Sequence, residues 1–164
     1  MEVEMKIRGL MMDPVTNMPI VVLKDAQGTA VLPIWVGIYE ANAIALEIEK
    51  VQTPRPMTHD LLRNVFLGLD VRVQKVVVND LKDDTFYALI WVERNGDIFS
   101  IDSRPSDALA LAVRAGAPIF AADEVIAESA IEFEHEVEDT EEVVEKFKDF
   151  LDHVTPEDFA GGSD

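Results

Sequence analysis

Apolar and polar residues follow one another along the first 130 positions in patterns that predict a series of strands and helices. Alternation typical of half-buried strands occurs at residues 2–12, 71–81, 85–93 and 97–102. Shorter apolar runs at residues 20–23, 30–36 and 119–121 predict three more strands. The pair Asn95-Gly96 is a strong hairpin signal, and Pro33 indicates an edge or bulge position in its strand.

Apolar residues three and four positions apart predict helices at residues 37–51, 58–68 and 105–115, with a helical turn at 124–128. Thr58 suits the N-cap of the second helix. Pro105 suits the first turn of the third helix, and Gly116 and Pro118 suit its end. Because strands and helices alternate irregularly, we expect an α+β fold. Its sheet is expected to be mixed but largely antiparallel, with hairpins and a meander packed by about three helices.

The C-terminal part of the chain differs from the rest in charge. The formal net charge is −18, and residues 122–164 contain 16 acidic but only 2 basic side chains. We therefore expect one domain at residues 1–130, followed at 131–164 by an acidic C-terminal helix and a frayed tail. Such acidity disfavours nucleic-acid binding unless a divalent cation or a local basic groove offsets it.

Several classes of function are disfavoured by what the sequence lacks. There is no cysteine, which excludes disulfides, thiolate metal sites and cysteine nucleophiles. There is no run of about 18 apolar residues and no signal-peptide pattern, so we expect a cytoplasmic protein without membrane contact. No phosphate-binding or dinucleotide-binding glycine motif is present, and we expect no organic cofactor.

Two segments combine an arginine, a proline, a hydroxyl residue and an aspartate at the start of a predicted helix. They are Arg-Pro-Met-Thr-His-Asp at 55–60 and Arg-Pro-Ser-Asp at 104–107. If the two helix starts lie close together, their side chains offer ligands for a divalent cation: His59, Asp60, Asp102 and Asp107. His59 is also a candidate general base. The alternative is structural, with Arg55 and Arg104 paired to these carboxylates as locks on the helix starts.

Three motifs together resemble the bifunctional nuclease family of bacteria, archaea and plants. They are Leu-Pro-Ile-Trp-Val-Gly-Ile-Tyr-Glu-Ala at 32–41, Pro-Arg-Pro-Met-Thr-His-Asp-Leu at 54–61 and Ile-Asp-Ser-Arg-Pro-Ser-Asp-Ala at 101–108. The resemblance covers residues 3–130. It implies a compact α+β domain that hydrolyses phosphodiester bonds in DNA and RNA, aided by a divalent cation such as Mg²⁺ or Mn²⁺.

The motif positions supply the candidate site. The catalytic candidates are His59, Asp60, Asp102, Arg104 and Asp107. The substrate-binding candidates are Arg55, Thr58 and Ser106, and the candidate metal ligands are Glu40, Asp102 and Asp107. A competing hypothesis is a non-catalytic binding or regulatory module in which the Arg-Pro turns are structural locks. Under either hypothesis we expect a homo-oligomer such as a dimer, because an edge strand can pair across a two-fold axis.

Overall fold

The computed structural model describes residues 1–129, and in that range seven strands form a single mixed sheet. The strands are β1 (Glu2–Met12), β2 (Pro19–Asp25), β3 (Val31–Trp35), β4 (Arg72–Lys82), β5 (Thr85–Arg94), β6 (Asp97–Ser103) and β7 (Ile119–Ala122). Their order across the sheet is β3-β2-β1-β7-β4-β5-β6. Every neighbouring pair is antiparallel except β4 and β7, which are parallel. The predicted α+β fold with a mixed, largely antiparallel sheet is confirmed.

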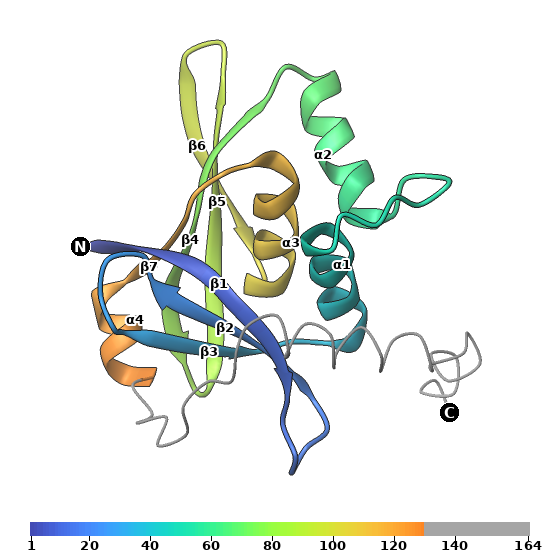
Figure 1. Cartoon of the computed structure of the whole chain (residues 1–164). Helices are drawn as coiled ribbons and strands as arrows, with labels where there is room; N and C mark the ends of the chain where they lie inside the picture. Colours follow the sequence, from blue (N-terminus) through green and yellow to red (C-terminus); the bar gives the residue numbers. More distant parts are fainter. Residues whose placement is uncertain (130–164) are drawn as a thin grey trace.

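Three of the four described helices lie beside one another on one side of the sheet (Figure 1). They are α1 (Ile38–Ile48), α2 (Thr58–Gly68) and α3 (Pro105–Ala115), and the fourth is the short α4 (Asp123–Ser129). Helix α3 contacts α1, α2, β4 and β5, whereas α2 packs mainly against α3. The position of α3 therefore determines where the starts of its neighbours meet.

Helix α3 is held in the core by its side chains. Leu109 and Leu111 are fully buried, and the small side chains of Ala108 and Ala112 on the same helix are also buried. Small residues let neighbouring elements approach the helix closely, and buried leucines contribute roughly 1.5–3 kcal/mol each through lost contact with water. This packing makes α3 the rigid centre of the helical layer.

The ends of α3 and the β5–β6 turn follow the sequence signals. Pro105 is the first residue of α3, and Gly116 ends the helix in the left-handed conformation, with φ of 67°. Asn95 and Gly96 have φ of 53° and 85°, as a tight hairpin turn requires. The expectation that Thr58 is the N-cap of α2 was wrong. Met57 occupies that position, and its N–H donates to Asp60 Oδ2 at 3.0 Å.

The expected helix and tail at 131–164 lie outside the described residues. Among residues 1–129, no helix is both long enough and apolar enough to cross a membrane.

Candidate functional site

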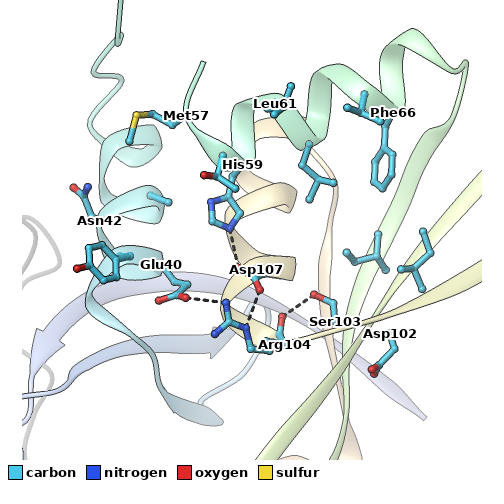
Figure 2. A pocket seen from close by; sticks show the side chains of 17 residues that line it. Glu40, Asn42, Met57, His59, Leu61, Phe66, Asp102, Ser103, Arg104 and Asp107 are labelled. Carbon is cyan, nitrogen blue, oxygen red and sulfur yellow. Dashed lines mark hydrogen bonds and ion pairs between the residues drawn. The ribbon is translucent and has the colours of Figure 1, made fainter. Parts of the chain in front are cut away.

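An open groove of about 950 Å³ lies between α2 and the β5–β6 pair and extends to the starts of α1 and α3. Its apolar lining comes from α2, β5 and β6: Leu61, Leu62, Val65, Phe66, Ile90 and Ile101. Its polar end is formed by side chains from three helix starts, which Figure 2 shows converging. A groove with an apolar part and a few convergent polar groups is the usual form of a ligand site.

His59 and Asp107 form the central pair of the polar end. His59 Nε2 lies 2.8 Å from Oδ1 of Asp107, and the dashed line in Figure 2 marks this contact. Because an ionised carboxylate only accepts hydrogen bonds, this contact places the proton of a neutral imidazole on Nε2. Nδ1 then carries a lone pair, and no hydrogen bond within residues 1–129 engages it. The pair resembles the carboxylate–histidine arrangement that orients a general base.

Arg104, the residue before α3, connects Asp107 to α1. Its Nε donates to Asp107 Oδ2 at 2.9 Å, and its Nη2 donates to Glu40 Oε1 at 2.8 Å. These hydrogen bonds, with Asp107 the larger contributor, raise the pKa of the Arg104 guanidinium. The side chain is nevertheless 67% exposed, so its remaining N–H donors face solvent at the groove. Arg104 can thus bind an anion while it holds two carboxylates in place.

Two opposing effects determine the charge of Asp107. Burial alone would raise the pKa of its carboxyl, but hydrogen bonds from His59 and Arg104 and the positive charge of Arg104 outweigh burial. The pKa of Asp107 therefore lies below its ordinary value. Asp107 is an anion at neutral pH and a permanent acceptor for His59.

A neighbouring ion pair, Asp60–Arg114, belongs to the framework. Arg114 is only 2% exposed, and its Nε donates to Asp60 Oδ1 at 2.7 Å. The same guanidinium donates to the backbone oxygens of Ala110 and Ala43, so it joins α1, α2 and α3. Burial opposes ionisation of Asp60, but the Met57 N–H and Arg114 together lower the pKa of its carboxyl. Sequence reasoning missed Arg114, although a lone arginine within an otherwise alanine- and leucine-rich helix is a detectable signal.

The structure brings together only part of the predicted set. Glu40, Thr58, His59, Arg104 and Asp107 all line the groove. Asp60 and Arg55 do not line it, and Arg55 is exposed in the loop before α2. Ser106 is buried and lines a different hollow, near Trp35. The suggested lock between Arg55 and Asp60 is not formed, because Arg114 occupies that carboxylate.

Asp102 lies at the rim of the groove, but Figure 2 shows its side chain pointing away from Asp107. Side chains alternate across a strand, and Ile101, the residue before Asp102, faces the groove. Glu40 and Asp107 are themselves bridged by Arg104. Among the described residues, no three histidine, aspartate or glutamate side chains are grouped as metal ligands. In this arrangement the three predicted carboxylates are not grouped as a set of ligands, and their assignment as metal ligands stays a prediction.

Comparison with known proteins finds one matching family model and several proteins of similar sequence. A family model described as bifunctional nuclease domain matches residues 21–134. An uncharacterized protein of Mycobacterium tuberculosis is 40% identical over 162 residues, which cover 95% of this chain and 97% of that protein. Bifunctional nuclease 1 of Oryza sativa subsp. japonica and bifunctional nuclease of Oryza minuta are each 25% identical over 103 residues. Those matches cover 60% of this chain and 31% of each plant protein.

Proposed function

Because the chain belongs to the bifunctional nuclease domain family, we propose that it hydrolyses phosphodiester bonds in DNA and RNA at the groove. The observation that carries this proposal is the His59–Asp107 pair, which lies beside an exposed arginine in that groove. The named plant relatives support the same class of reaction. The groove itself offers an apolar surface to a base and the exposed N–H donors of Arg104 to a phosphate.

In the proposed reaction, His59 Nδ1 removes a proton from the attacking water. The water oxygen forms a bond to phosphorus, the bond from phosphorus to the leaving oxygen breaks, and the leaving oxygen takes a proton from solvent, to which His59 later releases its own. Asp107 keeps the proton of His59 on Nε2 and stabilises the imidazolium that forms. General-base catalysis of this kind contributes typically 10²–10⁴-fold to a rate.

Arg104 stabilises the phosphate as negative charge builds on its oxygens. Its exposed N–H groups are available for this role because only two of its five donors are used by Glu40 and Asp107. Thr58 lines the groove and Arg55 is exposed in the loop before α2. In the proposal both contact flanking phosphates of a longer strand. Asp60 and Ser106 are left out of the proposed reaction because neither lines the groove.

The divalent cation remains a prediction. As arranged, the three carboxylates are not grouped as metal ligands, and the proposed reaction is written with residues of the groove alone. Cleavage with chelator, with Mg²⁺ and with Mn²⁺ tests the prediction directly. A cytoplasmic location likewise remains a prediction.

The deciding experiment measures cleavage of plasmid DNA and of a generic RNA by highly purified protein. The variants are His59→Ala and Asp107→Asn, with Val15→Ala as a matched control at an exposed loop residue outside the groove. Each variant is first shown to be folded by circular dichroism. We expect cleavage by the wild type and the control but at least 100-fold less by the two groove variants. Equal cleavage by all four proteins would assign the activity to a contaminant or to another site and overturn the proposal.

A second candidate is the non-catalytic module, and one observation favours it. Two hydrogen bonds of Arg104 go to carboxylates of its own chain, as expected of a lock between α1 and α3. In that case no purified form cleaves nucleic acid, and Asp107→Asn lowers the melting temperature without changing any activity. The same set of proteins therefore distinguishes the two candidates.

A further inference from the structure

The two edge strands of the sheet differ in how well they are protected against pairing with a further strand. At one edge, β3 contains Pro33, which lacks an N–H and so weakens pairing with another strand. At the other edge, β6 has seven residues with no proline and no lysine, and its register with β5 has no bulge. Within the described chain only β5 pairs with β6. Its outer N–H and C=O groups therefore form an open template for another strand.

Apolar side chains accompany this open edge. Ile101 lines the groove, and Phe99, two residues earlier, projects from the same face of β6 and is 45% exposed. On the other wall of the groove, α2 has no buried residue although it is rich in leucine. Leu61 is 56% exposed and Val65 is also exposed. Exposed apolar side chains gathered over one strand and one helix mark an interaction surface.

We propose that a second copy of this chain pairs with β6 about a two-fold axis, with the two β6 strands antiparallel. This proposal does not depend on the nuclease reaction. An axis perpendicular to the sheet joins two seven-stranded sheets edge to edge and keeps the helical layers on the same side. The surface is then self-complementary, as a two-fold interface must be. Both grooves also open on the same side of the dimer.

Full pairing of β6 selects one register, and the charges of the strand are compatible with it. With Ser100 on the axis, all seven residues of each β6 strand are paired. Asp102 then faces Ile98 of the second copy, and Asp97 faces Ser103, so no carboxylate opposes another. Arg104 of the second copy directly follows that Ser103. Its positive charge therefore lies near Asp97 and attracts the carboxylate. Phe99 faces Ile101 of the second copy on the helical side, which covers both side chains.

The size of the surface also fits a second copy. Stable interfaces use about 20–30 residues from each partner. Strand β6 supplies seven residues, and exposed residues of α2 and the adjoining β5–β6 turn add to them. Two copies thus cover the open edge and the exposed side chain of Phe99 at once.

The chain contains no cysteine, so a single introduced thiol tests the register. In the Ser100→Cys variant the two thiols meet on the axis, because directly paired residues have Cβ atoms about 4.5–5.5 Å apart. We expect mild oxidation to give a covalent dimer of twice the chain mass of 18.3 kDa. The control is Val15→Cys, at a loop residue that is 89% exposed and far from β6 in the sheet order. Cross-linking of Ser100→Cys no faster than that of the control would overturn the proposal.

Light scattering on the untreated wild type gives an independent measurement. We expect the mass of a dimer at micromolar concentration, and a monomer for the Phe99→Glu variant, which buries a charge in the interface. Val15→Glu should remain a dimer. A monomeric wild type would overturn the proposal and leave the edge to a different protein or to the C-terminal segment. A dimer that persists in Phe99→Glu would place the interface elsewhere and overturn it equally.

Discussion

His59 Nε2 and Asp107 Oδ1 lie 2.8 Å apart, although 48 residues separate the two positions in the chain. The contact joins the first turn of α2 to the first turn of α3. A structural lock and a catalytic pair place different demands on this contact. A lock needs only the hydrogen bond, whereas a catalytic pair also needs His59 to carry a proton during each cycle.

Replacing His59 by glutamine separates these roles. The amide can still donate a hydrogen bond to Asp107 but is not a base near neutral pH. We expect kcat for DNA and RNA cleavage to fall by about 10²–10⁴-fold while KM changes by less than about threefold. A melting curve should show a smaller loss of stability than in His59→Ala. Retention of full kcat by His59→Gln would remove His59 from the reaction.

The carboxyls of Asp60 and Asp107 make stability depend on pH. The pKa of each lies below its ordinary value in the folded protein, so each stabilises the fold when ionised. That contribution is fully present above the unfolded pKa of about 3.9 and is lost as the pH falls through the lower folded pKa. We therefore expect the difference in free energy of unfolding between the wild type and Asp60→Asn to shrink from pH 6 to pH 3. Urea unfolding at each pH measures it, and a constant difference would contradict the assignment.

Arg114 is expected to matter more for stability than any exposed arginine. Arg114→Met leaves Asp60 without its buried partner and removes the donors to two backbone oxygens, so we expect a loss of about 3–5 kcal/mol. The matched control is Arg72→Met, because Arg72 forms an exposed ion pair with Glu93. Such pairs contribute about 0–1 kcal/mol. Similar losses in both variants, measured by denaturant unfolding, would contradict a framework role for Arg114.

Two glycines near helix ends should respond oppositely to alanine. Gly116 has φ of 67°, a conformation that costs an alanine roughly 1–2 kcal/mol, so Gly116→Ala should destabilise the protein. Gly68 lies in α2 with open space around it, so Gly68→Ala should stabilise it by roughly 0.5–1 kcal/mol. Thermal unfolding of both variants beside the wild type shows whether each substitution raises or lowers the stability as expected. The same sign for both would show that backbone conformation is not the deciding factor.

Local signals allowed the fold to be predicted well. Pro105, Gly116 and the Asn95-Gly96 turn act through steric limits that operate within a few residues, so the helix end and the hairpin were predictable. The position of Thr58 was misjudged by one residue because Asp60, from the third position of the helix, supplies the cap to the Met57 N–H. The conformation of the Asp60 side chain, which the sequence pattern does not encode, made Met57 rather than Thr58 the N-cap residue.

The candidate site was predictable only in part. The helix starts were expected to contribute to it, and the structure does place His59 and Asp107 in contact. The partner of each charge was not predictable, because several arginines and carboxylates have similar local surroundings. Arg104 joins Glu40 across 64 positions, and Arg114 joins Asp60 across 54. Such pairings depend on how α3 sits between α1 and α2, which is a property of the packed core.

The place of β7 in the sheet has a consequence for the order of folding. Strands β1–β3 form one antiparallel ladder and β4–β6 form another, and within residues 1–129 only the four residues of β7 join them. During synthesis, the residues of both ladders and of all three main helices are joined to the chain before those of β7. A nascent chain that ends before Ile119 therefore consists of two half-sheets that share no backbone hydrogen bond across their boundary. Completion of the described sheet is then a late step, in which β7 pairs with β1 and β4 after both of those strands have been made.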